Sequence, residues 1–181
     1  MSAGRFIAVV GPSGVGKDSL MEGVVAACPS IRRARRVITR PSETGGEDFE
    51  GVSVAVFKAR LAQGAFCLHW EAHGLSYGIP AEVCQVLESG QDVLANLSRG
   101  MLGAAMEAFP HTLAVFVTAN PAILARRLEG RGRETQADIA RRLTRTAPAR
   151  PDGLAAIEID NSGPLETSVA RLVAALYPER G

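Results

Sequence analysis

A glycine-rich loop near the N-terminus has the residue types and the spacing of a phosphate-binding site. Residues 11–17 read Gly-Pro-Ser-Gly-Val-Gly-Lys, between an apolar run and a helical pattern. The glycines let successive backbone N–H groups converge on phosphate oxygens, and the helix that follows directs its positive end at the same anion. Lys17 would add a positive charge at the β- and γ-phosphates and take a catalytic role. The residues predicted to bind ATP here are Gly11, Pro12, Ser13, Gly14, Val15, Gly16, Lys17, Asp18 and Ser19.

The residue after Lys17 departs from the usual phosphate-loop pattern. That position is normally Ser or Thr, whose hydroxyl binds Mg²⁺, but here it is Asp18. A carboxylate is also a hard oxygen ligand, so we predict that Asp18 holds Mg²⁺ directly or through water. The alternative is that Asp18 only caps the start of the helix.

Short apolar runs alternate with longer helical patterns along the chain, which predicts an α/β fold. Continuous apolar strands are typical of a mostly parallel sheet with helices on both faces, the three-layer arrangement of P-loop NTPases. The expected strands are 6–10, 92–96, 112–117 and 155–160, and the expected helices are 19–27, 121–129 and 165–176.

Two segments interrupt this alternation. Residues 39–77 are rich in glycine, charge and aromatic side chains, and we interpret them as a lobe inserted over the ligand. Residues 130–135 (Gly-Arg-Gly-Arg-Glu-Thr) are typical of a mobile polar loop, and predict an arginine-bearing lid over about 130–138. The prediction is one P-loop kinase domain over 1–181, with its core in 1–38 and 78–181; ordinary surface connections are the alternative for both segments.

The composition argues against several other classes of protein. The 181 residues are 46% hydrophobic with a formal net charge of +1, so nothing in the overall charge attracts nucleic acid or a membrane. The arginine run at 32–36 is expected to form a solvated face. Three scattered cysteines suggest neither a disulfide framework nor a zinc site. No signal sequence and no apolar stretch of roughly 20 residues is present, so we expect a cytoplasmic protein.

The order of these motifs resembles the guanylate kinase family of P-loop kinases over nearly the whole chain. The resemblance implies that Arg40 and Tyr77 bind the acceptor phosphate, and that Gly46-Glu47 forms a turn in the inserted lobe. It places Asn161 near the adenine of ATP. It also implies a catalytic lid, whose arginines close over the transferred phosphoryl group: Arg127, Arg131, Arg133 and Arg142, of which Arg131 also contacts ATP.

The residues that would read a guanine match that family poorly. Its acidic Asp-x-Asp motif is replaced by Asn96-Leu97-Ser98, and its second phosphate-binding arginine by Ser42. Guanine presents N–H donors and needs carboxylate acceptors, whereas Asn and Ser both donate and accept, which suits sugar hydroxyls. The sequence therefore favours phosphoryl transfer to something other than a guanine nucleotide.

This combination is similar to a narrower family, the ribose 1,5-bisphosphate phosphokinases of the phosphonate pathway. The shared segments include Gly-Lys-Asp18-Ser, Thr39-Arg40-Pro41, Gly45-Gly46-Glu47-Asp48, the stretch 70–80 and Asn96-Leu-Ser98-Arg99. The resemblance implies transfer of a phosphoryl group from ATP to the 1-phosphate of ribose 1,5-bisphosphate, with Mg²⁺, in a reaction linked to phosphonate catabolism. It implies a small-molecule sugar bisphosphate as the substrate, and no nucleic-acid or membrane partner.

Further polar residues are candidates for binding the sugar bisphosphate. Ribose hydroxyls, or water around Mg²⁺, are assigned to Glu47, Asp48, Glu71, Asn96 and Ser98. A solvated charge is the alternative for Glu71. His73 is a further substrate candidate, with surface packing as its alternative. Arg99 would either bind a substrate phosphate or begin a helix.

Two other functions stay open at the level of sequence. One is a guanylate or other nucleoside monophosphate kinase. The other is a non-catalytic binding module, since guanylate-kinase-like folds also act as scaffolds.

Overall fold

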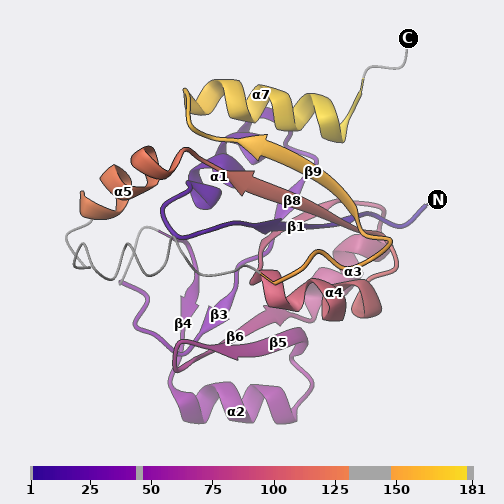
Figure 1. The fold of residues 1–181 in the computed structure, drawn as a ribbon. Helices are drawn as coiled ribbons and strands as arrows, with labels where there is room; N and C mark the ends of the chain where they lie inside the picture. Colours follow the sequence, from indigo (N-terminus) through magenta and orange to yellow (C-terminus); the bar gives the residue numbers. More distant parts are fainter. Residues whose placement is uncertain (1, 44–46, 131–147, 179–181) are drawn as a thin grey trace.

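The computed structural model describes residues 2–43, 47–130 and 148–178, and its centre is a five-stranded parallel sheet (Figure 1). The strand order is β2 (Arg32–Arg33), β7 (Val93–Asn96), β1 (Phe6–Val10), β8 (Thr112–Thr118) and β9 (Ala155–Asp160). All four neighbouring pairs are parallel. Since β1 lies in the middle, the loop that follows it leaves the sheet at its centre.

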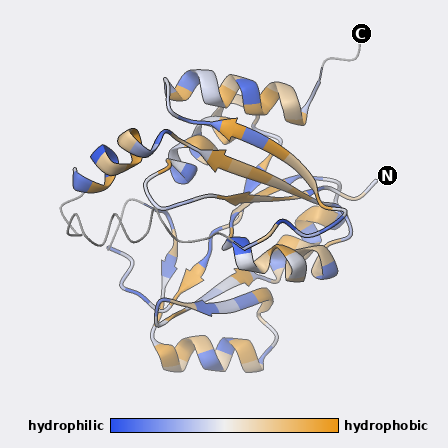
Figure 2. Cartoon of the chain, in the orientation of Figure 1, coloured by the Kyte–Doolittle hydropathy of each residue, from blue (hydrophilic) through white to orange (hydrophobic). Residues whose placement is uncertain are grey.

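Helices cover both faces of this sheet, as the continuous apolar strands predict. One face packs on α1 (Lys17–Ala27), α5 (Pro121–Glu129) and α7 (Leu165–Leu176), and the other on α3 (Glu82–Glu88) and α4 (Leu102–Ala108). Strand β1 contributes alternate residues to the two cores, which explains why it is apolar throughout (Figure 2). The predicted fold class is confirmed. Among the described residues, no helix is long and apolar enough to cross a membrane.

The predicted element bounds agree closely with the structure. Strands β1 and β9 and helices α5 and α7 have the expected ends, whereas α1 begins at Lys17, two residues earlier than expected. Asn120 accepts a hydrogen bond from the Ala122 N–H and Pro121 occupies the first turn, so α5 starts where local chemistry favours a start.

A second, mixed sheet contains the strands of the predicted lobe 39–77 but begins and ends outside it. Its strand order is β4 (Glu50–Gly51), β3 (Val37–Ile38), β6 (Leu75–Pro80) and β5 (Phe66–Ala72), accompanied by α2 (Val54–Ala62). The bounds differ because β3 precedes residue 39 and β6 continues to Pro80. The β5–β6 hairpin turns at His73 and Gly74, which both have positive φ, as a two-residue hairpin turn requires. Figure 1 shows this sheet and α2 to one side of the central sheet.

An ionic cluster ties the start of β1 to the start of β7 and the end of α7. Arg5 Nη2 lies 2.6 Å from Asp92 Oδ2, and the Tyr177 hydroxyl donates to the same oxygen at 2.6 Å. Burial alone would raise the pKa of Asp92, but hydrogen bonds from Arg5 and Tyr177 outweigh it and hold this pKa below its ordinary value. Burial and the contact with Asp92 raise the pKa of Tyr177 to about 12.

Candidate active site

One cavity of about 420 Å³ joins the glycine-rich loop to the second sheet. Its walls come from the loop and the start of α1, from the second sheet and its β5–β6 turn, and from the carboxyl end of β7. The lining residues are Gly11, Ser13, Gly14, Gly16, Lys17, Asp18, Ser19, Arg36, Arg40, Glu47, Trp70, Ala72, His73, Tyr77, Asn96, Leu97, Ser98 and Arg99. The predicted phosphate loop and most of the predicted substrate residues therefore share one space.

The loop has the backbone conformation that its glycines predict. Gly14 and Gly16 have φ of 82° and 92°, in the left-handed region that favours glycine. Lys17 Nζ donates to the carbonyl oxygens of Gly11, at 2.7 Å, and Pro12, at 3.2 Å. The Lys17 ammonium group is thereby held over the loop that it is predicted to serve.

Two side chains from distant parts of the chain donate hydrogen bonds to the backbone of this loop. The Val15 carbonyl accepts hydrogen bonds from Asn161 Nδ2 at 2.8 Å and Arg127 Nη1 at 3.1 Å. Arg127 Nη2 also donates to the Asn161 carbonyl at 2.9 Å. Asn161 is 3% exposed, and neither side chain lines the cavity. These hydrogen bonds show that Asn161 and Arg127 position the loop through the Val15 carbonyl. The adenine contact of Asn161 and the lid role of Arg127 stay predictions.

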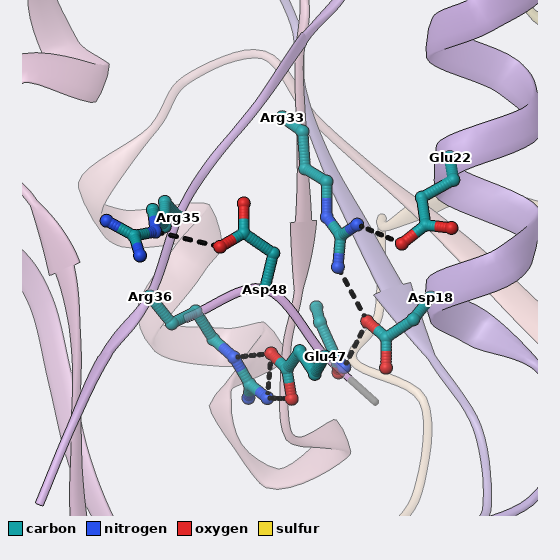
Figure 3. A network of polar contacts seen from close by, with 8 residues as sticks. Asp18, Glu22, Arg33, Arg35, Arg36, Glu47 and Asp48 are labelled. Carbon is teal, nitrogen blue, oxygen red and sulfur yellow. Dashed lines mark hydrogen bonds and ion pairs between the residues drawn. The ribbon is translucent and has the colours of Figure 1, made fainter. Parts of the chain in front are cut away.

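Asp18, in the first turn of α1, lines the cavity and pairs with Arg33, which lies outside the lining (Figure 3). Arg33 Nη2 lies 2.8 Å from Asp18 Oδ1, and Asn96 Nδ2 is 3.5 Å from the same atom. Arg33 Nη1 also contacts Glu22 at 3.2 Å. Asp18 lies in the first turn of α1, whose N-cap residue is Gly16, so stabilisation of the helix start by its negative charge stays an alternative.

The donor set at Asp18 is compatible with a magnesium ion. The second carboxylate oxygen of Asp18 makes no hydrogen bond within the described part of the chain, and it stands beside the phosphate loop. A hard oxygen ligand next to nucleotide phosphates is the usual way in which proteins share Mg²⁺ with a substrate.

The arginine run at 32–36 does not form the uniform solvated face that we expected. Arg32 and Arg35 are exposed, but Arg36 is 8% exposed, because this residue leads directly into the buried strand β3. Arg36 Nε and Nη2 donate to Glu47 at 2.8 Å and 2.6 Å (Figure 3). The Arg36 guanidinium also lies 5.2 Å from the centre of the Tyr77 ring. The sequence analysis did not predict that Arg33 and Arg36 form ion pairs at the site. The sequence feature that could have indicated this is the buried strand that follows them.

Seven of the predicted substrate residues line the cavity, and two do not. Those in the cavity are Arg40, Glu47, His73, Tyr77, Asn96, Ser98 and Arg99. Asp48 and Glu71 lie outside it. Asp48 pairs with Arg35 at 2.9 Å on an exposed surface. Glu71 follows the buried Trp70 on β5, and successive strand residues point to opposite faces, so its side chain faces solvent.

The remaining predicted site residues, Arg131, Arg133 and Arg142, lie outside the described residues, as does the predicted lid beyond Gly130.

Comparison with known proteins identifies the family of the chain. Residues 3–152 match the guanylate kinase family, and the chain belongs to it. The chain is 51% identical over 178 residues to ribose 1,5-bisphosphate phosphokinase PhnN of Ruegeria sp. (strain TM1040), covering 98% of this chain and 94% of that protein. It is 46% identical over 184 residues to the protein of the same name from Pseudomonas fluorescens (strain SBW25), covering 96% and 95%. The resemblance that the motifs indicate is therefore confirmed.

A solved structure supports the fold independently. Guanylate kinase from Anaplasma phagocytophilum superimposes with a TM-score of 0.67 at 22% identity, covering 97% of this chain and 85% of that chain. At this identity the similarity concerns the fold alone.

Proposed function

We propose that this chain phosphorylates the 1-phosphate of ribose 1,5-bisphosphate with ATP, giving 5-phosphoribosyl 1-pyrophosphate and ADP. The observation that carries the proposal is the single cavity in which a phosphate loop faces arginines on the opposite walls. The near-full-length similarity to ribose 1,5-bisphosphate phosphokinases supports the same reaction, and their name PhnN supports its link to phosphonate catabolism. A cytoplasmic location is part of this proposal.

The carboxylates of the cavity favour a sugar over a guanine base. Among the described lining residues they are Asp18 and Glu47, and each is paired with an arginine. Guanine would need acceptors for its N1–H and N2–H groups, but both oxygens of Glu47 already accept from Arg36, and Asp18 is the residue assigned to Mg²⁺. Asn96 and Ser98, which also line the cavity, can donate to and accept from ribose hydroxyls.

The chemistry requires positioning and neutralisation of charge rather than a general base. A phosphate monoester has its second pKa at about 6, so the acceptor oxygen is already largely ionised at pH 7. That oxygen attacks the γ-phosphorus of ATP, the bond from this phosphorus to the β–γ bridging oxygen breaks, and ADP leaves. Two anions must therefore be held in line despite their repulsion.

The residues of the cavity divide this task between donor and acceptor. The loop amides and Lys17 bind the phosphates of ATP, while Arg40 and Tyr77 bind the acceptor phosphate. Asp18 is the residue that would hold Mg²⁺, which when bound neutralises charge on the β- and γ-phosphates. Arg131, Arg133 and Arg142 belong to the proposal as lid residues.

A direct comparison of acceptors tests this function. The purified chain is given ATP and Mg²⁺ with either ribose 1,5-bisphosphate or GMP, and ADP release is followed in a coupled assay. We expect turnover with the sugar bisphosphate, at a kcat/KM well above that with GMP. Faster turnover of GMP would assign the chain to the nucleoside monophosphate kinases. Failure to bind ATP in titration calorimetry with Mg²⁺ would favour a non-catalytic binding module.

A further inference from the structure

Two arginines in the cavity differ from their neighbours because no carboxylate pairs with them. Arg33 and Arg36 both form ion pairs, whereas Arg40 and Arg99 form none with the described residues. The Nε atoms of Arg40 and Arg99 are both buried and have no hydrogen-bond partner in the described part of the chain. Both side chains are half-buried, and a buried N–H donor without an acceptor is unfavourable, so two such arginines in one cavity indicate a site for anions that bind from outside.

The two unpaired arginines stand on different walls. Arg40 follows strand β3 of the second sheet, and its guanidinium lies 4.3 Å from the centre of the Phe49 ring. Arg99 begins the short 3₁₀ helix η1 (Arg99–Met101), just after β7 of the central sheet, with its guanidinium 4.8 Å from the centre of the Phe116 ring. Each ring supports a guanidinium without neutralising its charge. The cavity thus presents one available cation from each sheet.

An acceptor with two phosphates matches this arrangement, and a nucleoside monophosphate does not. Arg40 and Tyr77 both line the cavity and are assigned above to the phosphate that is attacked. A second phosphate on the same sugar then needs its own cation. Arg99 is the remaining unpaired arginine among the described lining residues, and Ser98, which can bind a hydroxyl, directly precedes it.

We propose that Arg99 binds the 5-phosphate of the acceptor and so sets the preference for a sugar bisphosphate over a sugar with one phosphate. The inference rests on the proposed function and identifies a specificity-determining residue for it. Loss of a charge-assisted contact of this kind is expected to lower kcat/KM by about 10²-fold.

Removing the arginine and the phosphate separately tests the pairing. Arg99→Gln and the wild type are each assayed with ribose 1,5-bisphosphate and with ribose 1-phosphate, which lacks the 5-phosphate. We expect the substitution to lower kcat/KM by about 10²-fold for the bisphosphate and by less than threefold for the monophosphate. A merely structural role of Arg99 would lower both values together.

Arg150→Gln is the matched control variant. The Arg150 guanidinium lies 6.0 Å from the centre of the same Phe116 ring but does not line the cavity. We expect this variant to retain the wild-type ratio between the two acceptors.

Each outcome of these assays supports or contradicts the contact between Arg99 and the 5-phosphate. Equal losses with both acceptors, or an unchanged preference in Arg99→Gln, would overturn the role of Arg99 while the wild-type activity upholds the proposed function. A wild type inactive with both acceptors would overturn the proposed function and the inference together. Thermal unfolding of the variant shows whether it is folded, and a folded variant with the selective loss supports the inference.

Discussion

Removing the amide of Asn161 should weaken nucleotide binding without any change to a residue that lines the cavity. Asn161→Ala deletes the 2.8 Å hydrogen bond to the Val15 carbonyl, which keeps its second donor, Arg127, at 3.1 Å. Because the carbonyl is not left without a partner, the loss should be near that of one buried hydrogen bond, about 1–2 kcal/mol. For a chain of this size that corresponds to a fall in Tm of roughly 2–8 °C.

We expect Asn161→Ala to weaken the binding of nucleotide by a similar free energy. If the loop needs the Asn161 contact to hold its binding conformation, the Kd for ATP should rise by about 5–30-fold, at 1.4 kcal/mol per factor of ten. Titration calorimetry gives the Kd, and thermal unfolding gives the change in Tm. Arg126→Met is the control variant, because Arg126 is exposed and makes no hydrogen bond to the loop residues that the structure describes.

Arg127 provides a second test of the same reasoning. The double variant Asn161→Ala, Arg127→Met leaves the Val15 carbonyl without either side-chain donor. Its loss of stability should therefore exceed the sum of the two single losses, by about 0.5–3 kcal/mol. An Asn161→Ala protein with an unchanged Tm and a raised Kd would refute the positioning role and favour direct contact with the nucleotide. Unchanged Tm and Kd together would refute any role in the site.

Three further predictions concern charge and burial elsewhere in the molecule. Asp92→Asn should lower stability by about 1–3 kcal/mol at pH 7; since Arg5 helps hold the pKa of Asp92 below its ordinary value, this difference, measured by urea unfolding, should shrink below about pH 4. Burial, with Cys84 nearby, raises the pKa of Cys67 to about 12, so mass spectrometry should find Cys67 alkylated at pH 8 far more slowly in the folded chain than in urea; equal rates would contradict this. Glu47→Gln should lower the free energy of unfolding by about 3 kcal/mol, because it leaves the buried Arg36 charge unpaired; an unchanged urea midpoint would show that the pair is not stabilising.

The elements and the phosphate loop were predictable because their signals are local. A short continuous apolar run such as 6–10 is typical of a strand that is buried on both faces of a sheet, and Asn120-Pro121 favours a helix start. The positive φ of Gly14 and Gly16 likewise follows from glycine spacing within one loop. Such features depend on neighbours within a few residues, so the sequence alone is sufficient to predict them.

The direction of individual polar side chains was less predictable. Asp48 and Glu71 are carboxylates that could bind sugar hydroxyls. However, Asp48 pairs with Arg35, and Glu71 lies on the exposed face of β5. Arg36 belongs to the arginine run 32–36, which the sequence predicts to be solvated, but its side chain is buried and pairs with Glu47. A shift of one position along a strand moves a side chain to the opposite face of the sheet. The order of charged residues alone does not show which face each of them occupies.

By itself, the sequence determined a parallel α/β fold, a loop for phosphates and a family resemblance, because glycine spacing and apolar periodicity act through covalent geometry and short-range packing. Only the tertiary structure decided which charges are neutralised. The Val15 carbonyl meets donors from Arg127 and Asn161, which are 112 and 146 residues away in the chain, and Asp18 meets Arg33. Those pairings follow from the crossing of strands and helices at the carboxyl edge of the sheet, and they leave Arg40 and Arg99 without a carboxylate among the described residues.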